Sequence, residues 1–203
     1  MCVMPENLYI ALLHYPVYNK RGDVVTTAVT NMDIHDISRA ARTFGIKRFY
    51  IITPLEQQRQ YVERILYHWQ EGYGTTYNPS RKEAFDIVRV TETLDDTMTA
   101  IAQETGERVN LVVTSASPQG AFLTCGELRR KISQSNEAFL IVFGTGWGIA
   151  REVIERAEFL AEPIQGVSDY NHLSVRSAAA IMMDRLFRHN NEQDAISEED
   201  CGA

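Results

Sequence analysis

Apolar runs alternate with amphipathic stretches along most of the chain, a pattern that predicts β-strands separated by α-helices. Nearly continuous apolar runs predict strands at 7–17, 47–54, 85–92, 109–116 and 138–144, with a shorter one near 163–167. A helical spacing of apolar residues predicts helices at 34–44, 55–71, 80–84, 93–106, 124–134, 148–160 and 172–188. This order is typical of an α/β domain with a mostly parallel sheet and helices on both faces.

Polar residues and glycines mark the expected helix ends. Asp33 is expected to cap the first helix, and Gly45 to end it. Ser80 and Thr124 are each followed three residues later by a glutamate, which is the spacing of a capping box. These signals place four of the predicted helix ends.

The chain of 203 residues is long enough to bury a substantial core. We expect one domain over 1–188, in which 55–90 is a helical, insertion-like segment. Residues 189–203 are acidic and polar, and we expect them to be disordered. Apolar residues make up 44% of the chain, and no apolar stretch approaches the roughly 20 residues that a membrane span needs.

Charge and cysteine content narrow the class of protein further. The net charge of −7 argues against a general nucleic-acid coat protein, but residues 1–90 carry 11 Lys and Arg against 9 Asp and Glu. A polyanion would therefore bind this first half, unless its basic residues form an ordinary solvated surface. Cys2, Cys125 and Cys201 lie far apart, which predicts reduced thiols, a cytoplasmic protein and no metal site.

Three glycines follow the most apolar strand, in the sequence GTGWG at 144–148. Glycines at the carboxyl end of a strand allow the backbone to approach a ligand closely. A plain tight turn explains them equally well from the residues alone. A dinucleotide site is disfavoured, because its glycine fingerprint belongs at the first strand–helix turn of such a fold.

A dense polar segment precedes the last predicted helix. It contains Ser168, Asp169, Tyr170, Asn171 and His172, and small residues follow within the helix at 177–180. A polar turn before a helix can bind a ligand, but its residues also serve as ordinary helix caps. The small residues allow close packing of another backbone.

These segments resemble motifs of the SPOUT superfamily of trefoil-knot RNA methyltransferases. The order FGTGWG (143–148), IQGV (164–167) and NHLSVRSAAAI (171–181) is similar to its last two motifs. RAARTFG (39–45) is similar to the first motif of the SpoU-like branch, with Asp33 where that branch has asparagine. The stronger resemblance is to stand-alone SPOUT domains that are AdoMet-dependent RNA methyltransferases, some of whose relatives are fused to a tRNA guanine methyltransferase.

The resemblance implies a C-terminal deep trefoil knot, an exception to the rule that chains are unknotted. It also implies that S-adenosylmethionine (AdoMet) is bound by three loops. The residues expected to bind it are Thr114, Ser115, Ala116, Gly144, Thr145, Gly146, Trp147, Gly148, Ile164, Gly166, Tyr170, Asn171, His172, Leu173, Ser174 and Val175. An RNA substrate, a tRNA or an rRNA, and a homodimer built on the knot helices follow from the same resemblance.

Candidate catalytic residues also come from the resemblance. Arg39 takes the place of an arginine that favours a deprotonated ribose hydroxyl, and Asp169 is the nearest candidate for a general base. Asp33, His35 and Arg176 are expected to contact substrate. Ordinary structural roles remain open for all of them, including caps at Asp33 and a surface ion pair between Arg39 and its neighbour.

Two motif positions differ from the SpoU-like branch. Gly146 stands in place of a glutamate, and Ser174 and Arg176 stand in place of an asparagine and a serine. These differences motivate an alternative, in which the chain is a non-catalytic AdoMet-binding and dimerising module of another RNA-modifying enzyme. A nucleotide- or NAD-dependent enzyme is a third hypothesis that rests only on the GTGWG loop.

Overall fold

The computed structural model describes residues 6–72, 78–116, 120–168 and 170–187. The expected tail over 189–203 and the candidate base Asp169 lie outside these residues. None of the helices in the described ranges has the length and apolar character that a membrane crossing requires. The same ranges contain no cluster of three or more His, Cys, Asp or Glu side chains arranged to hold a metal ion.

Six strands form one sheet in which every neighbouring pair is parallel. Their order is β5–β4–β1–β7–β6–β8, so that β1 lies inside the sheet between β4 and β7. The mostly parallel sheet of the predicted α/β fold is therefore confirmed. The strands are β1 (Leu8–Leu13), β4 (Arg48–Ile52), β5 (Val88–Thr91), β6 (Val109–Val113), β7 (Ala138–Gly144) and β8 (Phe159–Leu160).

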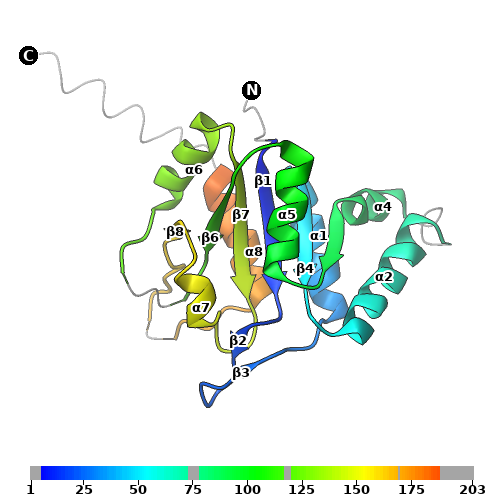
Figure 1. Cartoon of the computed structure of the whole chain (residues 1–203), viewed down its shortest axis with the longest axis horizontal. Helices are drawn as coiled ribbons and strands as arrows, with labels where there is room; N and C mark the ends of the chain where they lie inside the picture. The colour runs from blue at the N-terminus through cyan, green and yellow to red at the C-terminus, as the bar shows by residue number, and fades with distance from the viewer. Residues whose placement is uncertain (1–5, 73–77, 117–119, 169, 188–203) are drawn as a thin grey trace, which may run out of the picture.

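Helices cover both faces of this sheet (Figure 1). On one face lie α1 (Asn31–Thr43), α6 (Cys125–Gln134) and α8 (Val175–Phe187), and on the other lie α5 (Leu94–Thr105) and α7 (Arg151–Ile154). Two further helices, α2 (Glu56–Gln70) and α4 (Pro79–Asp86), extend the first layer beyond α1. The expected segment 55–90 thus contains these two helices and β5, an edge strand of the main sheet.

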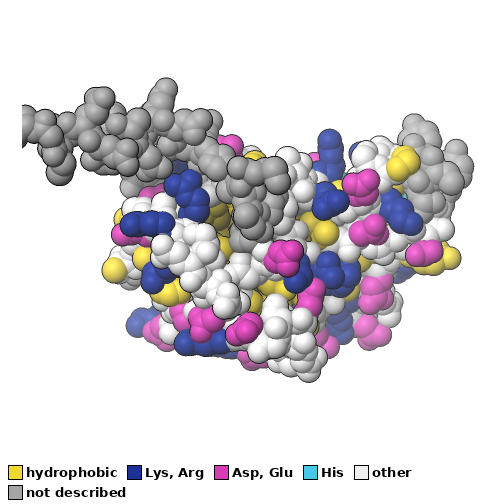
Figure 2. Space-filling model, turned by 90° about the horizontal axis from the view of Figure 1, so that it is seen from above, with side chains coloured by type: hydrophobic (Ala, Val, Ile, Leu, Met, Phe, Trp, Pro, Cys, Tyr) yellow, Lys and Arg dark blue, Asp and Glu magenta, His cyan; other side chains and the backbone are white. Residues whose placement is uncertain are grey.

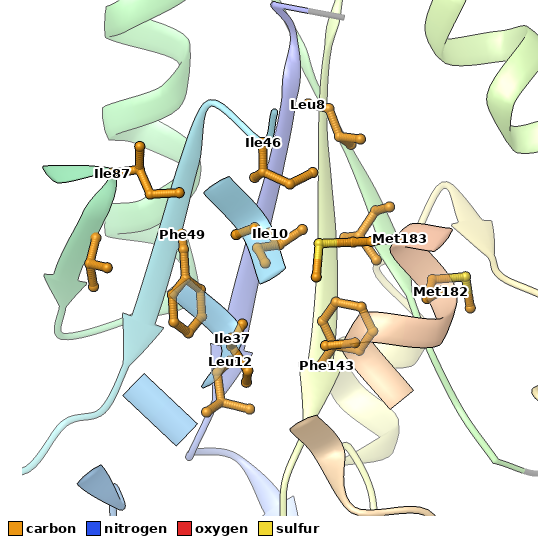
Figure 3. Packing of buried hydrophobic residues seen from close by; sticks show 14 of the residues in the cluster. Leu8, Ile10, Leu12, Ile37, Ile46, Phe49, Ile87, Phe143, Met182 and Met183 are labelled. Atoms are coloured by element: carbon orange, nitrogen blue, oxygen red, sulfur yellow. The ribbon is translucent and has the colours of Figure 1, made fainter. Parts of the chain in front are cut away.

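Burial on both faces explains why the strands are so continuously apolar. Leu8, Ile10 and Leu12 of β1 point into the core beneath α1 and α8, where Figure 3 shows them with side chains from both helices. Tyr9 and Leu13 point the other way, into the core beneath α5 and α7. Alternation along a strand sends successive side chains to opposite faces, so both sets must be apolar when both faces are covered.

Side-chain caps fix the helix starts, and two of them differ from expectation. Thr30, not Asp33, caps α1: its hydroxyl oxygen accepts from the Asp33 amide at 3.2 Å, and the hydroxyl donates to the Asp33 carboxylate at 2.6 Å. Asn78, not Ser80, caps α4, since its side-chain oxygen accepts from the third residue of that helix. The capping box at Thr124 is confirmed by reciprocal bonds with the glutamate three residues later.

The chain after β7 departs most from the prediction. The helix expected over 148–160 is only α7, and the strand expected near 163–167 lies earlier, at β8. Glu158 accounts for the change, because its carboxylate accepts from the amide of Leu111 at 2.7 Å and from Arg108 at 3.1 Å. These bonds hold the segment beside β6, where the extended strand β8 begins at the next residue.

Two smaller differences lie near the carboxyl ends of the strands. Between β1 and α1 lies a short hairpin that the sequence pattern did not predict, formed by β2 (Val17–Tyr18) and β3 (Val24–Val25). The last helix begins at Val175 rather than at 172, because the Ser174 hydroxyl oxygen accepts from the amide three residues later.

Ion pairs neutralise part of the basic excess of the first half. Arg42 pairs with Glu83 at 3.6 Å, and Arg48 with Glu104 at 3.2 Å. In the view of Figure 2, Lys and Arg side chains are interspersed with Asp and Glu side chains. This face therefore does not carry a large patch of one sign.

Candidate functional site

The GTGWG loop lies at the carboxyl edge of the sheet, where β7 ends beside β1. Gly144 is paired in register with Leu13, the last residue of β1. On one side of this point the chain proceeds through β4 and β5, and on the other through β6 and β8. Ligands of parallel sheets bind at such a switch point, because the flanking loops separate there.

The segment after β1 holds the glycine loop in place. The amide of Trp147 donates to the Tyr18 carbonyl at 2.9 Å, and the amide of Tyr18 donates to the Gly148 carbonyl at 2.8 Å. The amide of Ala150 donates to the carbonyl of Pro16, which follows a cis peptide bond. The loop is therefore shaped by the chain's own backbone along most of its length.

Two of the three glycines are required by this packing. A Cβ at Gly144 would lie 2.5 Å from Cγ1 of Ile149, and a Cβ at Gly146 would lie 2.8 Å from the Tyr18 carbonyl oxygen. Gly148 differs, since it has a φ of 114° and no described atom lies within 4 Å of a Cβ built on it. An open side toward a ligand is thus left at Gly148, and next to it the Trp147 side chain is 60% exposed.

The other two predicted loops meet at the same edge. Thr114 directly follows β6 and donates from its hydroxyl to the Val142 carbonyl at 3.0 Å. The Ala116 carbonyl accepts from the side-chain amide of Asn171 at 3.3 Å, which joins the loop after β6 to the loop before α8. Asn171 therefore bridges two loops instead of capping α8. Ser115, which lies between Thr114 and Ala116 in the sequence, is partly buried.

The loop before α8 is open to solvent over most of its length. Gly166, Tyr170, His172 and Leu173 are exposed, and the rings of Tyr170 and His172 meet edge to face at 5.3 Å. Ile164 and Val175, at its two ends, pack against the core beneath α8. The loop is thus anchored at both ends and presents its middle to solvent.

An ion-pair cluster joins the first turns of α1 and α8. Nε of Arg176 lies 3.4 Å from the Asp33 carboxylate, and its Nη1 lies 3.0 Å from the carboxylate of Asp36. Asp33 is buried, so its charge requires this partner. Arg176 is accordingly held within the chain, where it balances both acids.

Arg39 lies one turn further along α1 and is exposed. Among the described residues its guanidinium has no ion pair or hydrogen bond, because the neighbouring Asp36 is engaged by Arg176. The surface pair between Arg39 and Asp36 that the sequence left open is thus not formed. Arg39 is thus an exposed cation on α1 without a counter-charge paired to it in the described part of the chain.

His35 points away from that cluster. Its ring meets the edges of Trp69 and Phe85 at centroid distances of 5.6 and 4.8 Å, between α1, α2 and α4. Burial lowers the pKa of His35, and the nearby guanidinium of Arg81 lowers it further. His35 therefore belongs to the packing of α2 and α4 on α1, and the structure does not bring it together with the glycine loop.

His14 was not singled out by the sequence, yet it is linked through Thr27 to Thr145, the first residue after β7. His14 follows β1 directly, is fully buried, and its Nδ1 lies 3.0 Å from the hydroxyl oxygen of Thr27. That hydroxyl contacts Thr145, whose own hydroxyl donates to the Leu13 carbonyl at 3.0 Å. Burial lowers the pKa of His14 to about 4, against a smaller opposing effect of Asp33. A histidine at the end of an otherwise apolar strand was the signal that could have identified it.

Comparison with known proteins shows which proteins this chain is similar to. Residues 7–188 match a family model described as SAM-dependent RNA methyltransferase. The chain is 42% identical over 185 residues to an uncharacterized protein of Aquifex aeolicus, with 91% of this chain and 90% of that protein covered. It is 44% identical over 181 residues to a tRNA (guanine-N(1)-)-methyltransferase of Oleidesulfovibrio alaskensis, which covers 89% of this chain but only 42% of that relative.

Solved structures agree on the fold. A SpoU methyltransferase of Streptomyces viridochromogenes, solved in complex with AdoMet, superposes with a TM-score of 0.57 at 11% identity. The match covers 91% of this chain and 58% of that one. At this identity the likeness is one of fold, and it agrees with the resemblance that the sequence motifs carry.

The packing of Gly144 predicts a specific energetic coupling. Gly144→Ala should lower the free energy of unfolding, because the new Cβ would collide with Cγ1 of Ile149. Ile149→Ala removes that atom, so the double variant should be more stable than the sum of the single effects predicts, by about 1 kcal/mol. Urea unfolding of the four proteins measures this coupling, and strictly additive effects would contradict the contact.

The buried His14 predicts a loss of stability in acid. Its pKa is about 4 in the folded chain and 6.5 when unperturbed, so between these values the unfolded chain binds more protons. Stability should therefore fall as the pH drops from 6.5 toward 4, by about 3 kcal/mol from this group. The free energy of unfolding should be compared with that of His14→Gln across this range. A difference that stays constant with pH would show that His14 does not titrate in this way.

Proposed function

This chain belongs to the family of SAM-dependent RNA methyltransferases, and we propose that it binds AdoMet at the carboxyl edge of its sheet and methylates an RNA nucleotide there. The observation that carries the proposal is the meeting of three loops at this edge. The loop after β6 contacts the loop before α8 through Asn171, and the GTGWG loop follows the adjacent strand. The first turn of α8 in turn contacts α1, on which Arg39 lies.

The residues at this edge suit AdoMet. Gly148 leaves an open side, and the exposed ring of Trp147 is available to cover a flat adenine. Carbonyl and amide groups of 114–116 and of 164–175 would hold the nucleoside and methionine parts. When bound, AdoMet supplies an electrophilic methyl group on a positively charged sulfur.

Arg39 is proposed to activate the nucleophile. A methyl acceptor must present a lone pair, and an RNA hydroxyl does so best when it is deprotonated. A guanidinium without a counter-charge stabilises such an oxyanion, and its exposure allows RNA to approach it. Arg176 supports this role, because it engages Asp36 and so keeps that carboxylate from neutralising Arg39. Asp169, the other expected catalytic residue, lies outside the described residues.

The substrate is proposed to be a tRNA or an rRNA. One relative is named a tRNA (guanine-N(1)-)-methyltransferase, but this chain spans only 42% of its length, so that activity can reside in either part of the relative.

RNA and AdoMet are cytoplasmic, and the buried free thiol of Cys125 is compatible with that compartment. The expected knot stays part of the proposal.

A homodimer is proposed to complete the site. Val167, Tyr170, Leu173 and Trp147 are large apolar or aromatic residues, and each of their side chains is about half exposed or more. They lie on the loop before α8 and on the glycine loop. Exposed apolar residues that cluster on neighbouring loops favour association, and a two-fold contact would cover them in both subunits at once.

Replacement of Arg39 tests the chemistry. With labelled AdoMet and total RNA, wild type should incorporate methyl groups and Arg39→Ala should do so roughly 100-fold more slowly, while calorimetry gives similar AdoMet affinities. Arg42→Ala, which removes a neighbouring arginine already paired with Glu83, is the matched control and should remain active. AdoMet binding without incorporation by wild type would instead favour the non-catalytic module.

A charge placed in the apolar loop tests the dimer. Leu173→Glu should convert a dimer to a monomer in sedimentation equilibrium, because a carboxylate would be buried in the contact. Tyr67→Glu changes a more exposed residue on α2, on the other side of the molecule in Figure 1, and should leave the dimer intact. A wild-type monomer, or a dimer that survives Leu173→Glu, would refute this arrangement.

A further inference from the structure

His14 directly follows β1, at the carboxyl edge of the sheet. The residues two and four positions earlier, Leu12 and Ile10, point to the face covered by α1 and α8, so His14 points to that face as well. Its ring is fully buried. Thr145, the first residue after β7, lies beside His14, because β1 and β7 are neighbouring strands.

A chain of hydrogen bonds connects this ring to the glycine loop. The Leu13 carbonyl can only accept, so the Thr145 hydroxyl donates to it at 3.0 Å. The oxygen of Thr145 then accepts the proton of the Thr27 hydroxyl, and the oxygen of Thr27 accepts from Nδ1 of His14 at 3.0 Å. The Thr27 hydroxyl also lies 3.5 Å from the His14 carbonyl, a longer contact that competes for the same proton. The direction given satisfies the three shorter bonds, and it assigns the imidazole proton to Nδ1 by inference from the network.

The same direction leaves Nε2 of His14 as a bare acceptor. No described group donates to it, although the atom is buried. A buried acceptor without a donor is costly, and an apolar side chain of similar size would fill the space without that cost. The feature that an apolar side chain could not supply is the Nδ1–H donor to Thr27.

We propose that His14 is a positioning residue, which through Thr27 and Thr145 holds the GTGWG loop in the shape that binds AdoMet. Thr145 is the point at which the loop leaves β7, so fixing its hydroxyl on the Leu13 carbonyl sets the direction of the three glycines that follow. The hydroxyl of Thr145 is thus bonded within the protein, while the residue itself stays partly exposed. This inference rests on the proposed function, because it assigns the loop to AdoMet.

Two variants of equal polarity distinguish this role from simple filling of space. Asn in place of His14 puts an amide nitrogen near the position of Nδ1, whereas Gln puts its amide near the position of Nε2. By calorimetry, His14→Asn should keep AdoMet affinity within about threefold of wild type, and His14→Gln should weaken it by about tenfold or more. Equal affinities in the two variants, with both folded by circular dichroism, would overturn the proposal.

Thr27 provides an independent test that leaves the histidine intact. Thr27→Val is nearly isosteric but lacks the hydroxyl, and it should weaken AdoMet binding as much as His14→Gln does. Thr27→Ser keeps the hydroxyl and should bind as wild type. Normal binding by folded Thr27→Val would exclude the hydrogen-bond chain as the means of positioning.

The outcomes separate this inference from the function on which it rests. If wild type does not bind AdoMet, the proposed function fails, and the role of His14 fails with it. If wild type binds and the paired variants do not differ, only the role of His14 fails. Nitrogen chemical shifts of the imidazole add a readout that needs no ligand, since the proposal requires the proton on Nδ1.

Discussion

Parallel pairing of β1 with β7 is the interaction on which the site depends. These strands are separated by more than a hundred residues in the sequence, yet their register sets Leu13 against Gly144 and so brings the next residues of both strands together. The segment after β1 then runs along the loop after β7 and supplies its hydrogen-bond partners at Pro16 and Tyr18. A shift of register would separate His14 from Thr145 and remove the backbone partners of the loop together.

The second determinant is electrostatic and joins the two ends of the fold. Asp33 and Asp36 on α1 share Arg176 on α8, so a buried acid is balanced by a cation from the far end of the chain. Two differences from the SpoU-like motifs thereby meet in space, since Asp33 stands in place of an asparagine and Arg176 in place of a serine. Because Arg176 engages Asp36, that carboxylate is not paired with Arg39 among the described residues.

The strands could be predicted because burial on both faces requires continuous apolar runs, as at 138–144. The position of the GTGWG loop at the carboxyl edge of the sheet could be predicted from the glycines that follow an apolar strand. Why a glycine is needed there could not be predicted. A side chain at Gly146 would collide with the carbonyl oxygen of Tyr18, which is remote in the sequence. Local patterns also failed where one side chain redirects the chain, as Glu158 does by bonding to β6. His14 escaped notice because one buried polar residue in a strand has no periodicity.

The contact between α1 and α8 also affects the order in which parts of the fold can form during synthesis. Arg176 lies 140 positions from Asp36, and closing so long a loop costs chain entropy that only late contacts can offset. During synthesis, α1 leaves the ribosome with its two acids long before the guanidinium that balances them. We therefore expect the nascent chain to hold its first helix loosely, and the carboxyl edge of the sheet to assemble only after translation is nearly finished.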